Sequence, residues 1–172
     1  MSATVRMQPI GLVKNRIQPH ENIMNYREEI SEIIIEPSLE EALEGLEENS
    51  HILVIFWMDR VPEEDRGLLK VRPMRRDDLP LVGILATKAP NRPNGIGVTT
   101  VELLCKERNV LKVKGLDAWN ETPVLDIKPF NLTPEALPVI RGPWWAQKPG
   151  GKEAANGAYR VHPDEEPPSI QV

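Results

Sequence analysis

The sequence is poor in the residues that build disulfides and metal sites. Cys105 is the single cysteine, which excludes an intrachain disulfide and a thiolate zinc cluster within one chain. The three histidines show no metal-ligand spacing, so we expect no metal site. No run approaches the roughly 20 apolar residues that cross a bilayer, and the first residues lack a signal-peptide core. We therefore expect a soluble, cytoplasmic protein with no membrane partner.

Familiar nucleotide and hydrolase motifs are also absent. No GxGxxG follows a strand-like segment, and no GxxxxGK[ST] is present, which disfavours dinucleotide-binding and P-loop folds. No GxSxG is present either, so a nucleophile-elbow hydrolase is disfavoured. The function must depend on a different arrangement of residues.

Proline and glycine are abundant, and they divide the chain into short segments. With 172 residues, 17 prolines and 11 glycines, the sequence suits one domain of short strands joined by fixed turns. Apolar patterns predict one short helix at 38–48, whose Ser38 and Glu41 form a capping-box signature. They also predict strands at 7–14, 29–36, 51–58 and 122–130 and a hairpin across 97–117. The fold class is mainly β.

Two segments carry more specific expectations. The continuous apolar run 51–58 predicts a central strand that is buried on both faces. Cys105 lies in the apolar strand VELLC, where a small buried side chain is the expected role. We place a folded domain at 1–131 and a Pro/Gly-rich extension at 132–172, with Trp144 and Trp145 as its anchors.

Charge is distributed unevenly along the chain. Residues 21–49 carry ten acidic side chains against one basic, whereas residues 60–92 carry eight basic against five acidic. The basic residues of this second segment, Arg72, Arg75 and Arg76 among them, could form a phosphate-contacting surface, although the acidity of the whole chain argues against a general nucleic-acid coat. The plainer interpretation is a solvated loop whose own acidic residues neutralise it.

The turn between residues 87 and 97 holds an arginine and two amides in a stiff frame. Pro90 and Pro93 restrict the backbone, while Gly95 permits conformations that other residues resist. Such a loop would hold Arg92 and Asn94 in place before a ligand arrives, which lowers the ordering cost of binding. An ordinary Pro-Asn-Gly turn with an exposed arginine is an equal alternative.

A second polar group lies in GLDAWNETPVLDIKPF. Alternate strand residues point the same way, so Asp126 and Lys128 share one face of the strand 122–130. Asp126 lies between Leu125 and Ile127, which is unusual for a mere surface residue. The alternative is a solvent-facing ion pair.

The segments HILVIFW, VRP, GILATKAPNRPNGIGVTTVEL and GLDAWNETPVLDIKPF, in this order, resemble the signature blocks of the TsaA-like (TrmO-type) family. The resemblance extends from about Pro9 to Phe130. It implies a small β-barrel-like domain and an S-adenosylmethionine-dependent methyltransferase that works as a homodimer, with the cofactor near the subunit interface. It also implies tRNA as partner and N6-methylation of threonylcarbamoyladenosine beside the anticodon.

The resemblance also assigns site residues by position. Arg92, Asn94, Asp126 and Lys128 match the family pattern directly. The positions that correspond to cofactor contacts are Met24, Asn25, Asp59, Arg60, Lys88, Val98, Asn120, Glu121, Thr122 and Pro123. The chain departs from the pattern at Lys88, Ala89, Gly95 and Glu121, where the family has arginine, serine, proline and glycine. A lysine cannot make the planar, two-pronged hydrogen bonds of an arginine, so we expect these departures to weaken or reshape cofactor binding.

We hypothesise that Asp126 accepts or orients the proton of the target nitrogen, while Arg92 and the basic loop hold tRNA phosphates. Two alternatives remain open from the sequence. The chain could be a non-catalytic module that binds S-adenosylmethionine or RNA, or it could methylate a small molecule or a protein.

Overall fold

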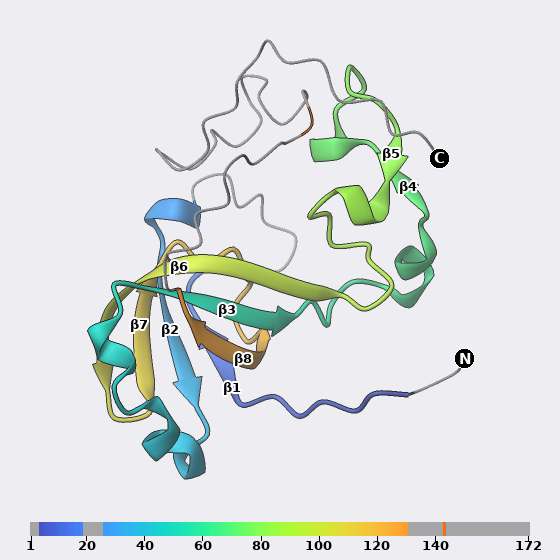
Figure 1. Ribbon diagram of the computed structural model, residues 1–172. Helices are drawn as coiled ribbons and strands as arrows, with labels where there is room; N and C mark the ends of the chain where they lie inside the picture. Colours follow the sequence, from blue (N-terminus) through green and yellow to red (C-terminus); the bar gives the residue numbers. More distant parts are fainter. Residues whose placement is uncertain (1–3, 19–25, 131–142, 144–172) are drawn as a thin grey trace, which may run out of the picture.

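Six antiparallel strands close into a barrel in the computed structural model, which describes residues 4–18, 26–130 and 143 (Figure 1). The strands are β1 (Gly11–Lys14), β2 (Ile30–Ile35), β3 (His51–Trp57), β6 (Ile96–Glu107), β7 (Val110–Lys114) and β8 (Pro123–Pro129). Around the barrel the order is β1-β2-β7-β6-β3-β8. The predicted mainly β, barrel-like fold is confirmed. No helix among the described residues is long and apolar enough to cross a membrane.

The barrel interior forms the core because side chains alternate across each strand. In β2, Ser31, Ile33 and Ile35 are buried while the residues between them are exposed. The same alternation in β3 corrects the expected burial on both faces. Ile52, Val54 and Phe56 are buried inside, whereas the residues between them are only half-buried on the outer surface of the barrel.

The predicted hairpin is formed by β6 and β7, with Arg108 and Asn109 as its turn. The register of the pair shifts between Leu103 and Cys105, an irregularity that interrupts the alternation of side chains. As a result Leu104 and Cys105 are both exposed, so the expected burial of Cys105 is wrong.

The predicted helix is present as two short 3-10 helices, η2 (Pro37–Leu43) and η3 (Leu46–Glu48). η2 begins at Pro37, whose fixed φ suits a first helical position, and its N-cap residue Glu36 makes no side-chain cap hydrogen bond. The expected capping box of Ser38 and Glu41 is therefore not what starts this helix. Leu43 is the residue of η2 that is buried against the core.

Residues 58–95, which we call the arm, leave the barrel after β3 and return to it at β6. The arm contains η4 (Glu63–Gly67), β4 (Lys70–Val71), η5 (Pro73–Arg75), β5 (Val82–Gly83) and η6 (Ile84–Ala86). β4 and β5 form a two-stranded ribbon that projects from the barrel (Figure 1). The expected loop at 60–80 is therefore a chain of short elements.

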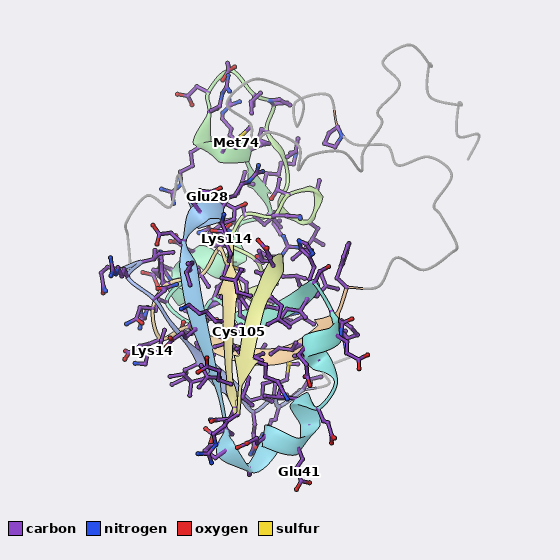
Figure 2. All side chains as sticks on the ribbon, turned by 90° about the vertical axis from the view of Figure 1, so that its left-hand side faces the viewer. Lys14, Glu28, Glu41, Met74, Cys105 and Lys114 are labelled. Atoms are coloured by element: carbon purple, nitrogen blue, oxygen red, sulfur yellow. The ribbon has the colours of Figure 1, made fainter. Side chains whose placement is uncertain are left out.

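The charge asymmetry along the sequence becomes a separation in space. Glu41 of the acidic η2 segment lies at one end of the molecule and Met74 of the arm at the other (Figure 2). Another short 3-10 turn, η1 (Tyr26–Glu28), precedes β2. The expectations for the extension 132–172, including its two tryptophans, lie outside the described residues.

Candidate active site at the barrel rim

Three strand ends meet at one rim of the barrel. Phe56, near the end of β3, pairs with Gly97 at the start of β6 and with Val124 at the start of β8. This register brings three segments that are distant in sequence to the same rim, namely 58–60, 94–96 and 120–123. Most of the sequence-predicted cofactor contacts therefore gather here.

Arg60 joins two of these segments directly. Its Nη1 donates a hydrogen bond to the Asn120 carbonyl oxygen at 3.0 Å. Its Nη2 lies 3.9 Å from Glu121 Oε2, and its Nε lies 4.0 Å from Asp59 Oδ2. The Arg60 side chain is 31% exposed, so the guanidinium borders both the rim and solvent. The predicted grouping of Asp59, Arg60, Asn120 and Glu121 is present in the structure.

The turn that carries Asn120 is held by a polar network with β1 and β2. The Asn15 backbone N–H donates to Asn120 Oδ1 at 3.1 Å, and Asn15 Nδ2 donates to Ser31 Oγ and to the Ala118 carbonyl, both at 3.0 Å. Thr122, which is 4% exposed, accepts the Val13 N–H at its carbonyl at 3.0 Å. Thr122 is thus a buried anchor of the turn, and Pro123 then begins β8.

Glu121 occupies a backbone conformation that suits glycine. Its φ is +65°, in the left-handed region that non-glycine residues enter at a cost. The carboxylate lies 2.9 Å from Lys14 Nζ, and this hydrogen bond together with the charges of Lys14 and Arg60 lowers the pKa of Glu121. The side chain therefore places a negative charge at the rim where the family motif has none.

We expect Glu121→Gly to raise the thermal midpoint of unfolding above that of Glu121→Ala by roughly 2–4 °C at neutral pH, because only glycine relieves the backbone strain.

A lowered pKa in the folded state means that the Glu121 carboxylate stabilises the fold above the unfolded-state pKa. This contribution is lost as the pH falls through the folded-state pKa. The wild type and Glu121→Gln should therefore converge in stability at acid pH in thermal scans. Equal midpoints for the glycine and alanine variants would contradict the strain argument.

A row of side chains crosses the outer surface next to the rim. Ile55 of β3 pairs with Val98 on one side and with Asp126 on the other. Val98 is 49% exposed and offers an apolar contact. Asp126 is held in place, since its Oδ1 accepts the Ile127 N–H at 2.9 Å and its Oδ2 lies 2.8 Å from Lys128 Nζ. The ion pair faces solvent, as the plainer interpretation of Asp126 and Lys128 predicts.

The stiff turn before β6 is stabilised by hydrogen bonds within the turn, and two of them are made to Thr87. Arg92 Nη1 donates to the Thr87 carbonyl at 2.6 Å, and Thr87 Oγ1 accepts the Ala89 N–H at 3.2 Å. Arg92 is half-buried while Asn94 and Lys88 are exposed. One nitrogen of the Arg92 guanidinium is thus held by the backbone of the turn itself.

Arg72, Arg75 and Arg76 lie in the segment between β4 and β5. Arg72 donates to the Leu79 carbonyl at 2.6 Å, and Arg76 makes two hydrogen bonds to Asp78 at 2.9 and 2.7 Å. The pair with Asp78 raises the pKa of Arg76. The side chain of Arg75, by contrast, makes no hydrogen bond or ion pair within the described residues, and the residue follows Met74 at the far tip of the arm (Figure 2). Local acidic residues therefore neutralise part of the basic patch, as the sequence allows.

Met24 and Asn25 lie outside the described residues. Sequence reasoning missed Lys14 and Asn15, and it counted Arg66 only among the basic residues that could contact phosphates, although all three contact the rim residues. Within the described ranges, no group of three or more histidine, cysteine, aspartate or glutamate side chains could hold a metal ion.

This chain is similar to known proteins in both sequence and fold. A family model described as the tRNA-methyltransferase O N-terminal domain matches residues 12–134. A probable S-adenosyl-L-methionine-binding protein of Archaeoglobus fulgidus is 36% identical over 148 residues, covering 83% of this chain and 38% of that protein. A tRNA (adenine(37)-N6)-methyltransferase of Escherichia coli is 34% identical over 125 residues, covering 70% of this chain and 53% of the relative.

A crystal structure of TrmO from Pseudomonas aeruginosa superposes with a TM-score of 0.66 at 28% identity, covering 84% of this chain and 63% of the other. The chain thus spans about four to six tenths of the length of these three proteins. The family model covers the arm and all of the barrel except Gly11, the first residue of β1.

Proposed function

This chain belongs to the family of the tRNA-methyltransferase O N-terminal domain, and on that premise we propose that it is an S-adenosylmethionine-dependent methyltransferase acting on tRNA. The proposed acceptor is N6 of threonylcarbamoyladenosine beside the anticodon. The observation that carries the proposal is the meeting of Arg60 with Asn120 and Glu121 at the rim, beside the row from Val98 to Asp126.

The donor set at the rim suits S-adenosylmethionine. The cofactor carries an ammonium, a carboxylate, ribose hydroxyls and an adenine ring. Asp59 could bind the ammonium or a ribose hydroxyl, Arg60 or Lys88 the carboxylate, and the exposed Val98 the ring. When bound, the cofactor supplies an electrophilic methyl group on a sulfonium.

The remaining work of the reaction is positioning and proton transfer. Asp126 lies on the same outer surface as Val98, with β3 between their strands, and its carboxylate is oriented by Ile127 and Lys128. In our proposal it takes the proton that the carbamoylated adenine nitrogen must lose before it becomes an effective nucleophile. In the same proposal Asn94 and Lys128 contact the acceptor, while Arg92 and the arm arginines 72, 75 and 76 contact tRNA phosphates.

We also propose that the chain works as a homodimer whose second copy covers the outer surface beside the site. Support comes from three exposed apolar side chains on paired strands, Trp57, Ile96 and Val98, with 43%, 38% and 49% of their surface accessible. Apolar groups gathered in this way are typical of a surface that another molecule covers.

Arg60→Met should weaken S-adenosylmethionine binding at least tenfold, because it removes a charged donor and releases the Asn120 turn. Isothermal titration calorimetry with adenosine as a reference ligand measures this loss. The control is Arg108→Met, which alters an exposed arginine on the hairpin turn. Undiminished affinity in Arg60→Met would remove this residue from the cofactor site.

A second function is favoured by the name of the Archaeoglobus relative, which describes binding alone. Glu121, with its charge at a position where the motif has glycine, is the feature of this chain that fits such a binding module. Saturable cofactor binding with no methyl transfer to any tRNA would favour this alternative.

A further inference from the structure

Arg66 is an arginine that hardly reaches solvent. Its side chain is 10% exposed, and it extends from η4 back to the base of the arm. Nη2 donates to the Met58 carbonyl at 2.8 Å and more weakly to the Asp59 carbonyl at 3.5 Å. Glu63 lies 3.4 Å from Nε on the outer side. The Arg66 guanidinium therefore donates its hydrogen bonds to the backbone segment that leads into Arg60.

The same guanidinium also covers Gly95, the last residue before β6. A Cβ on Gly95 would overlap Arg66 Nη1 and lie 3.1 Å from Cζ. The φ of Gly95 is +43°, which independently disfavours other residues. Glycine at this position therefore leaves the space in which the guanidinium sits.

These contacts close the base of the arm. The Met58 N–H donates to the Gly95 carbonyl at 2.7 Å, and the Met58 carbonyl accepts from Arg66. Gly95 in turn donates its N–H to the Arg92 carbonyl at 3.3 Å. One side chain thus touches both stems of the arm, one leading to Arg60 and the other coming from Arg92.

We propose that Arg66, seated on Gly95, is a positioning residue that fixes the arm against the cofactor rim. This inference rests on the proposed function, and it assigns a role to a residue that lies outside the proposed cofactor and RNA contacts. Its consequence is that Arg66 controls the alignment of the acceptor with the cofactor. Small misplacements of reacting groups cost up to about a hundredfold in rate, so the loss should fall on turnover.

The test compares Arg66→Ala, Arg66→Lys, Gly95→Ala and the double variant Arg66→Ala/Gly95→Ala. Methyl transfer to tRNA is measured well below the unfolding transition and divided by the number of cofactor sites counted by calorimetry. We expect kcat per cofactor site to fall about thirtyfold in Arg66→Ala and in Gly95→Ala. Arg66→Lys should retain part of the wild-type kcat per cofactor site, because the lysine ammonium can still donate to the Met58 carbonyl. The double variant should be no slower than the worse single variant, because both changes break the same contact.

Gly67→Ala is the matched control, since nothing lies within 4 Å of its added methyl group and it neighbours Arg66. A purely structural role would lower the thermal midpoint and leave kcat per cofactor site unchanged, which would overturn the inference. Multiplicative losses in the double variant would overturn it as well.

A wild type that binds no S-adenosylmethionine would instead contradict the proposed function. The contact between Arg66 and Gly95 is then tested by thermal midpoints, where less-than-additive losses in Arg66→Ala, Gly95→Ala and the double variant support the contact and additive losses refute it.

Discussion

Gly11→Ala should lower the free energy of unfolding by about 3 kcal/mol, one of the largest losses that a single methyl group can cause here. Gly11 pairs with Ile35 across β1 and β2. A Cβ on Gly11 would overlap the Ile34 carbonyl oxygen and lie 2.9 Å from Ile35 Cα. Backbone atoms of a paired strand cannot rotate away as a side chain can. The added methyl group would therefore push β1 away from β2 and break their pairing at Gly11 and Ile35.

Urea unfolding followed by circular dichroism measures the change, which should appear as a lower midpoint with an unchanged slope. Gly83→Ala is the matched control because its added methyl group meets nothing within 4 Å. A Gly11→Ala variant within about 0.5 kcal/mol of the wild type would show that β1 can shift without loss, contrary to the close approach described above.

Asp126→Asn should reduce methyl-transfer turnover by about a hundredfold while leaving the affinity for S-adenosylmethionine unchanged. The amide has nearly the shape of the carboxylate but cannot take a proton at neutral pH, and a positioned general base contributes at least this much. The change also removes the ion pair with Lys128, which is exposed and contributes little to stability.

Turnover is followed with labelled cofactor and saturating tRNA, and cofactor affinity is followed by calorimetry. Glu102→Gln is the control, since this exposed carboxylate on β6 pairs with His51 at the opposite end of β3 from the rim. Turnover equal to that of the wild type would remove Asp126 from the chemistry and leave it as half of a surface ion pair.

Local patterns were sufficient for most of the barrel strands. The isoleucine-rich segment 29–36 is followed by a proline, and the segment 122–130 has a proline near its end, so their strands were found close to the observed β2 and β8. The burial of 51–58 was misjudged because a strand in a barrel has an outer face that apolar residues can also occupy. Cys105 was misplaced because a register shift between paired strands leaves no mark in the local pattern.

The candidate site could be predicted only as separate pieces. Motif resemblance identified Arg60 and Asn120, but their contact joins residues far apart in sequence and depends on the closure of the barrel. The glycine of the family motif could have indicated the positive φ of Glu121. Nothing in the sequence around Arg66 shows that it turns back onto Gly95, since this contact depends on the path of the arm.

The central claim is tested most directly by incubating the full chain with methyl-labelled S-adenosylmethionine and total tRNA, then digesting the RNA and identifying the labelled nucleoside by mass spectrometry. We predict that the label appears in N6-methylated threonylcarbamoyladenosine. No labelled nucleoside should form when the tRNA is digested with RNase before the reaction. Saturable cofactor binding without label in any nucleoside would contradict the account and identify the chain as a binding module.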